Sequence, residues 1–86
     1  MAFKLLWNAA AQDDLKRLGP ASAKRIIDKV AGHLVKDPIN LATPLKGNLA
    51  GLHKYRIGDY RAIIAINLAD QDIRILRIGH RKDVYK

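Results

Sequence analysis

The hydrophobic period of the chain changes near residue 50, and this change constrains the fold more than any other feature. Before it, apolar residues recur at the spacing of an amphipathic helix, most clearly between Ala23 and Leu34. After it, apolar and basic residues alternate in short runs that are separated by Gly58-Asp59 and by residues 68–72. A two-residue loop with glycine first is typical of a type II′ hairpin. The C-terminal half is therefore predicted to consist of antiparallel strands.

The N-terminal half is predicted to supply one strand and two helices. Residues 3–7 form a short β-prone run, and Asn8 is a suitable N-cap for a helix that ends at Leu18. The next helix begins at Pro20, since proline is favoured in the first turn. It ends before Pro38, because the residue that precedes a proline avoids the helical region.

The order β-α-α-β-β-β predicts an α+β fold, in which an N-terminal helical hairpin packs on one face of an antiparallel sheet. The 86 residues allow one domain, which we expect to span residues 1–86. The chain has no cysteine, which excludes a disulfide framework, a zinc ribbon and a thiol nucleophile. The absence of disulfides is typical of proteins in the reducing cytoplasm. No apolar run approaches the roughly 20 residues of a membrane span.

The charge of the chain is strongly unbalanced. Sixteen Lys and Arg residues face eight acidic residues, all of them Asp, and the formal net charge is +8. This excess favours an acidic partner, with nucleic acid first and an anionic membrane second. The alternative is a basic surface that serves only solubility.

The predicted hairpin separates apolar from basic residues. If Gly58 and Asp59 form its loop, Arg56 lies opposite Arg61, and directly opposed residues point to the same side of a sheet. That side also carries Lys54, and opposed like charges are destabilising, so we expect an anion to bind there. The alternative is a solvated outer face. The other side is the predicted core face, formed by Tyr55, Ile57, Tyr60, Ala62, Ile64 and Ile66.

The last strand and the residues after it continue this scheme. Leu76 and Ile78 are predicted to face the core, with Arg77 on the opposite side. Four polar residues then follow within a short distance: His80, Arg81, Lys82 and Tyr85. An imidazole that titrates near neutral pH, a fixed cation and a phenol together suit a phosphodiester-cleaving site.

Three segments carry a resemblance to a known family: Leu45-Lys46-Gly47, Tyr55-Arg56-Ile57-Gly58-Asp59-Tyr60-Arg61 and Arg77-Ile78-Gly79-His80-Arg81-Lys82-Asp83-Val84-Tyr85. In these segments, and over nearly its whole length, the chain resembles a RelE-type toxin of the RelE/ParE toxin–antitoxin superfamily. The resemblance implies a metal-independent endoribonuclease without a cofactor, which enters the ribosomal A site and cuts the mRNA codon there. It also implies a cognate antitoxin, RelB-like or related, as a partner beside the ribosome and mRNA.

The resemblance assigns roles to individual residues. Lys54 matches a family lysine on the second strand, and Arg61 and Arg81 match arginines that hold the scissile phosphate. Tyr85 matches a tyrosine near the reactive hydroxyl, with His80 as a substitute for proton transfer. Leu52 departs from the family, because some members carry a second lysine there, and this leaves the general base open. Four further cations are predicted to contact RNA phosphates: Lys46, Arg56, Arg77 and Lys82.

Two other functions compete with this hypothesis. The chain could be a gyrase inhibitor of the ParE branch, although that branch usually lacks the set formed by Lys54, Arg61 and the ending His80-Arg81 with Val84-Tyr85. It could also be a noncatalytic basic RNA-binding module. The three histidines are dispersed and cysteine is absent, so no metal site is predicted.

Overall fold

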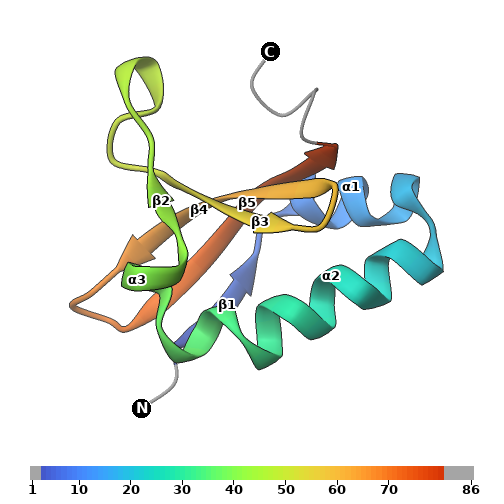
Figure 1. Cartoon of the computed structure of the whole chain (residues 1–86), viewed down its shortest axis with the longest axis horizontal. Coiled ribbons are helices and arrows are strands. Elements are labelled where there is room, and N and C mark those ends of the chain that lie inside the picture. The colour runs from blue at the N-terminus through green and yellow to red at the C-terminus, as the bar shows by residue number, and fades with distance from the viewer. Residues whose placement is uncertain (1–2, 81–86) are drawn as a thin grey trace.

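The computed structural model of the chain describes residues 3–80 and places two helices against a five-stranded sheet (Figure 1). No helix within that part of the chain is long and apolar enough to cross a membrane. The elements in chain order are β1 (Lys4–Trp7), α1 (Ala9–Leu18), α2 (Pro20–Gly32), η1 (Leu34–Lys36), α3 (Pro38–Leu41), β2 (Thr43–Pro44), η2 (Gly47–Leu49), β3 (His53–Ile57), β4 (Tyr60–Asn67) and β5 (Asp72–His80).

The sheet has the strand order β1-β5-β4-β3-β2, and β3, β4 and β5 are antiparallel as predicted. The short β2 adds a further antiparallel strand that the sequence did not predict. The exception is β1, which pairs with β5 in parallel. The sheet is therefore mixed, and the expectation of a purely antiparallel sheet is wrong at this edge. The α+β class and the helical hairpin are confirmed. Local sequence carries no signal for the direction of β1, because its pairing partner β5 lies at the other end of the chain.

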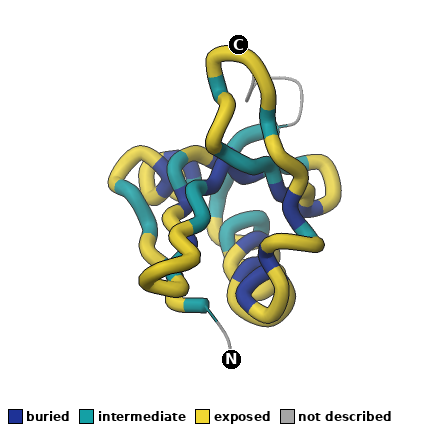
Figure 2. The backbone as a smooth tube through the Cα atoms, turned by 90° about the vertical axis from the view of Figure 1, so that its left-hand side faces the viewer, coloured by how far each residue is buried: buried dark blue, intermediate teal, exposed yellow. Residues whose placement is uncertain are grey.

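The core lies between the helices and the inner face of the sheet, where buried segments of both layers meet (Figure 2). The predicted core face of the hairpin is confirmed, since Tyr55, Ile57, Ala62 and Ile64 are buried and Tyr60 and Ile66 pack against them. The helix side contributes Ala11, Ile26, Val30 and Leu34. Burying a large apolar side chain stabilises a folded protein by about 1.5–3 kcal/mol. This layer is therefore the main source of stability in the fold.

The hairpin has the predicted register and turn. Arg56 pairs with Arg61 and Ile57 pairs with Tyr60. Gly58 has a φ of 58°, whereas Asp59 does not adopt positive φ, as a type II′ turn requires. Glycine adopts this conformation without the steric cost that a Cβ would add.

A β-bulge in β5 changes the predicted faces of the last strand. Ile63 pairs with Arg77 whereas Ile64 pairs with Ile75, so Leu76 is the extra residue. Ile75 is fully buried in the core and Leu76 is only half-buried, so the expectation that Leu76 faces the core is wrong. After the bulge, residues again alternate between the outer face and the core face, and Ile78 is buried as predicted.

The first helix and the start of the second follow the sequence signals, but the cap of the first helix and the end of the second differ from prediction. The helix after Asn8 runs over the expected residues, yet the Asn8 side chain makes no capping bond. Its Oδ1 accepts a hydrogen bond from Nη1 of Arg74 on β5, at 3.3 Å. The second helix ends at Gly32, earlier than predicted, and a 3₁₀ turn and the short α3 follow it.

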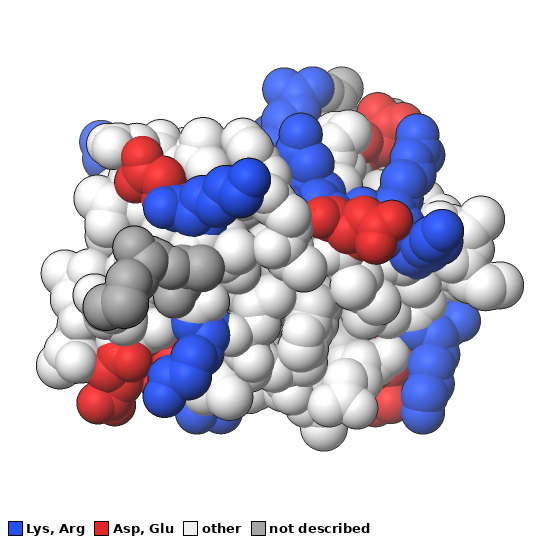
Figure 3. Space-filling view, turned by 90° about the horizontal axis from the view of Figure 1, so that it is seen from below, with Lys and Arg blue, Asp and Glu red and all other residues white. Residues whose placement is uncertain are grey.

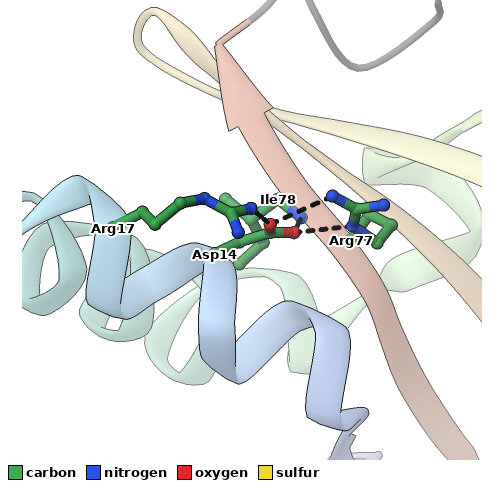
Figure 4. A network of polar contacts seen from close by, with 4 residues as sticks. All are labelled: Asp14, Arg17, Arg77 and Ile78. Carbon is green, nitrogen blue, oxygen red and sulfur yellow. Dashed lines mark hydrogen bonds and ion pairs between the residues drawn. The ribbon is translucent and has the colours of Figure 1, made fainter.

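One buried carboxylate joins α1 to the end of β5 (Figure 4). Asp14 is 1% exposed and accepts hydrogen bonds from the backbone N–H of Ile78 at 2.8 Å and from Nε of Arg77 at 2.9 Å. Arg17 donates to the same carboxylate from the next turn of α1. Burial opposes ionisation, but the hydrogen bonds from Arg77 and Ile78 and the two arginine charges outweigh it. The pKa of Asp14 is therefore lowered.

Replacing Asp14 by asparagine is expected to destabilise the fold. The change removes charged hydrogen bonds and leaves an amide N–H facing two arginines, so we expect a loss of about 1.5–3 kcal/mol in urea denaturation at pH 7. Asp13→Asn is the matched control, because Asp13 is exposed on the same helix. Its effect should stay within about 0.5 kcal/mol. Equal losses in the two variants would show that the Asp14 network does not hold the fold.

The same pair of variants gives a pH dependence with a definite sign. The folded-state pKa of Asp14 lies below its ordinary value of 3.8, so its stabilising contribution is complete above that pH. It is lost as the pH falls from about 4 through the folded-state pKa. The stability difference between the parent and Asp14→Asn should therefore shrink below pH 4. A difference that grew on acidification would contradict the assigned ionisation.

Candidate nucleic-acid interface

The face of the sheet that points away from the helices carries the predicted basic cluster. Register places Lys54, Arg56 and Arg61 on this outer face, because each alternates with a buried residue of the core face. Arg56 is exposed, whereas Lys54 and Arg61 are half-buried, and Nε of Arg61 is shielded from solvent. The structure thus brings three predicted cations together on two adjacent strands.

The outer face can be followed across β3, β4 and β5 in two rows. In one row Arg56 pairs with Arg61, and Arg61 pairs with Gly79, which contributes no side chain. In the next row Lys54 and Arg77 both pair with Ile63. Ile63 is 5% exposed although it lies opposite the helix-side core, so it forms an apolar centre between two cations. The arrangement combines positive charge with a shielded apolar spot.

The remaining predicted RNA contacts lie around this cluster. Lys46 is exposed in the loop that precedes β3, and this loop rises on the side of the sheet away from α2 (Figure 1). The guanidinium of Arg77 is bound to Asp14, whose hydrogen bond raises the pKa of Arg77. Lys82 lies outside the described residues. Asp14 therefore compensates the charge of Arg77 in part, and the contact of Arg77 with RNA stays a prediction.

His80 lies on the other side of the sheet. It pairs with Tyr60, and the two rings meet edge to face with centroids 6.1 Å apart. The Tyr60 hydroxyl is 3.1 Å from the Ser22 hydroxyl on α2, which fixes this pair on the helix side. His80 is therefore placed away from the face of Arg61. The predicted catalytic residues Arg81 and Tyr85 lie outside the described residues.

A buried tyrosine fixes the strand that carries two of the cations, and sequence reasoning did not find its partner. The Tyr55 hydroxyl lies 2.5 Å from Nδ1 of His33, at the end of α2, and burial raises the pKa of Tyr55. Tyr55 lies between Lys54 and Arg56 and points to the opposite side. Anchoring it holds the two cations outward. Only the helix geometry brings His33 to this strand, so local sequence carries no signal for the contact.

Nearly the whole chain matches one protein family. The family described as the ParE toxin of the type II toxin–antitoxin system parDE matches residues 5–85. The chain belongs to the RelE/ParE superfamily of type II toxins.

Several similar proteins place the toxin on the RelE side of that superfamily. Two curated proteins of Mycobacterium tuberculosis resemble it. Toxin RelG is 30% identical over 86 residues, which is 100% of this chain and 99% of the relative. Toxin RelE is 37% identical over 78 residues, which is 91% of this chain and 80% of the relative. The toxin–antitoxin complex RelBE2 of the same organism contains a chain with a TM-score of 0.89 and 28% identity, and the match covers 94% of this toxin and 100% of that chain.

The helix side of the toxin differs from the outer face in its charge. Seen from that side, basic and acidic side chains both surround a largely uncharged centre (Figure 3). A cavity of about 340 Å³ opens between α2 and the hairpin turn, lined by Arg25, Lys29, Ile57, Gly58, Asp59 and Tyr60. It lies away from Lys54 and Arg61. Within residues 3–80, no three His or Asp side chains gather where they could hold a metal ion.

The opposed Arg56 and Arg61 are expected to lower the stability of the fold and to strengthen its binding to RNA. Arg56→Gln removes one charge from a directly opposed like-charged pair, so the free energy of unfolding should rise by about 0.2–1 kcal/mol. Binding to RNA should weaken, and its log–log salt slope should become shallower by roughly 0.7–0.9 for one lost phosphate contact. Urea denaturation and a filter-binding salt series measure the two effects.

Lys24→Gln on α2 is the control, because Lys24 is exposed and the change in net charge is the same. It should alter neither quantity beyond the general effect of one charge. If Arg56→Gln and Lys24→Gln behaved alike in both measurements, the outer face would not be an RNA-binding surface.

Proposed function

We propose that the toxin is a ribosome-dependent endoribonuclease that cleaves mRNA codons in the A site without a metal ion. The observation that carries the proposal is the grouping of Lys54, Arg56 and Arg61 on one face of β3 and β4, opposite the core. Cleavage of a phosphodiester needs cations where negative charge develops, and these side chains meet that need. Similarity to the mycobacterial toxins RelG and RelE supports the same reaction class.

The reaction is an internal transesterification. The ribose 2′-oxygen forms a bond to the adjacent phosphorus, the bond from phosphorus to the 5′-oxygen breaks, and the products are a cyclic phosphate and a 5′-hydroxyl end. A base removes the proton of the 2′-hydroxyl and an acid protonates the departing 5′-oxygen. The net change requires no oxidant, metal or second substrate.

The side chains of the toxin divide this work by their chemistry. Arginine stays protonated in proteins, so Arg61 and Arg81 stabilise the charged phosphorane electrostatically. Lys54 and Tyr85 transfer the protons, because an amine and a phenol can each donate or accept a proton in general acid–base catalysis. His80 is the less suited group, because its ring contacts Tyr60 on the helix side.

A second part of the proposal concerns the partner. A toxin with a net charge of +8 that acts on ribosomes must be neutralised in its own cell. The similar RelBE2 structure is a toxin–antitoxin complex. We therefore expect a cognate antitoxin for this chain. When the antitoxin is absent, the toxin acts on the ribosome and its mRNA.

Single-turnover cleavage on programmed ribosomes tests the proposed chemistry. Arg61→Ala, Arg81→Ala and Tyr85→Phe should each lower the cleavage rate at least about tenfold, because each removes charge stabilisation or proton transfer. Ribosome affinity should fall much less. Lys24→Ala, on the opposite side of the molecule, should cleave like the parent.

His80→Ala decides the assignment of the proton-transfer group. It should cleave nearly as the parent does. A large loss with His80→Ala, together with a silent Tyr85→Phe, would transfer the role to His80. Parent-like cleavage by all four site variants would refute the site. If the parent altered DNA supercoiling and cut no mRNA, the toxin would instead act on gyrase, as the ParE description of the family suggests.

A further inference from the structure

Two arginines from different elements converge on one carboxylate at the β5 edge of the sheet. Nη2 of Arg77 lies 3.1 Å from Oδ1 of Asp14, and Nη2 of Arg17 is bonded to the same oxygen (Figure 4). One guanidinium belongs to α1 and the other to β5. Because both bond to a single oxygen atom, the shared carboxylate keeps two like charges within a few ångströms of each other.

Compensation of Asp14 does not require both arginines. Arg77 alone supplies a bidentate contact, and the N–H of Ile78 adds a third hydrogen bond. Arg17 therefore leaves the cluster with one surplus positive charge. The Arg17 and Arg77 side chains remain 66% and 59% exposed, while Asp14 is 1% exposed. The cluster thus presents cations to solvent and hides its anion.

The pair continues the outer face of the sheet. Arg77 lies in the same row as Lys54, with Ile63 between them. Strands are spaced about 4.8 Å apart, so the backbones at Lys54 and Arg77 are separated by roughly 10 Å. The bulge at Leu76 also places Arg74 on this face, one row further along β5. Positive charge therefore runs from β3 over β5 to α1.

We infer that Arg17 and Arg77 form a pre-organised pair that binds a backbone phosphate of RNA at the α1–β5 edge, with buried Asp14 as its fixed support. The inference rests on the proposed function, which supplies RNA as the partner. Guanidinium groups match phosphate oxygens with paired N–H donors. Side chains already held in place lose less freedom when the phosphate binds. RNA that reaches the scissile site at Arg61 would extend along this edge.

The salt dependence of ribosome binding tests the pair without any cleavage. The probe is a purified ribosome that carries an mRNA with a 2′-deoxy sugar at the cut position. Arg17→Gln should make the log–log salt slope shallower by about 0.7–0.9, because one phosphate contact is lost. Its urea midpoint should fall less than that of Asp14→Asn, since Arg77 still bonds to Asp14. Lys16→Gln, exposed on the same turn, should leave the slope as it is in the parent.

The remaining outcomes are equally decisive. Equal slopes for Arg17→Gln and Lys16→Gln would overturn the inference. The inference would also be overturned if Arg17→Gln left the salt slope of ribosome binding unchanged but weakened binding of the antitoxin. That result would assign the pair to a protein interface. A parent that bound ribosomes but never cleaved mRNA would refute the proposed reaction, while the slopes would still decide whether the pair binds phosphate.

Discussion

The carboxylate of Asp14 is the interaction on which the junction of helices and sheet most depends. β1 supports β5 only as far as Ile75, whose carbonyl accepts the N–H of Asn8. Beyond that point α1 takes the place of a strand, and Asp14 accepts a buried hydrogen bond from the N–H of Ile78. A buried charge is tolerated there because Arg77 and Arg17 compensate it. The end of β5 is held by this contact.

The hairpin shows how much of the fold the sequence predicts. Gly58 fixes the turn type, and the alternation on either side of it then determines register, core face and outer face together. The end of the first helix before Gly19 and the start of the second at Pro20 follow from the conformational limits of glycine and proline. These are local signals, and local signals are readable in one sequence.

The features that escape prediction depend on contacts between distant segments. The parallel direction of β1 and the bulge at Leu76 depend on pairing with strands that are distant in the sequence. Neither feature produces a recognisable pattern in the residues next to it. The same holds for the site. Lys54, Arg56 and Arg61 could be grouped from the hairpin alone, whereas the binding of Arg77 by Asp14 joins residues 63 positions apart. His80 was assigned to the site by its position in the chain, but its pairing with Tyr60 turns it to the helix side.

The charge distribution connects this architecture to the proposed activity. The helix side carries charges of both signs (Figure 3). The outer face carries the opposed Arg56 and Arg61 and is the side that can meet a polyanion. Opposed like charges reduce stability, and a bound phosphate would remove that cost. The apolar layer beneath them, centred on Ile64, Ile73 and Ile75, supplies the rigidity that such a face requires.

The most direct test of this account is a primer-extension map of mRNA ends in cells after induction of the toxin, with Arg61→Ala expressed at the same level. The account predicts new 5′ ends inside translated codons for the parent, loss of these ends when ribosomes are kept off the message, and few or none for Arg61→Ala. New ends in untranslated RNA would contradict dependence on the ribosome. Growth arrest with no new ends, or equal ends from both proteins, would contradict the catalytic role of the outer face.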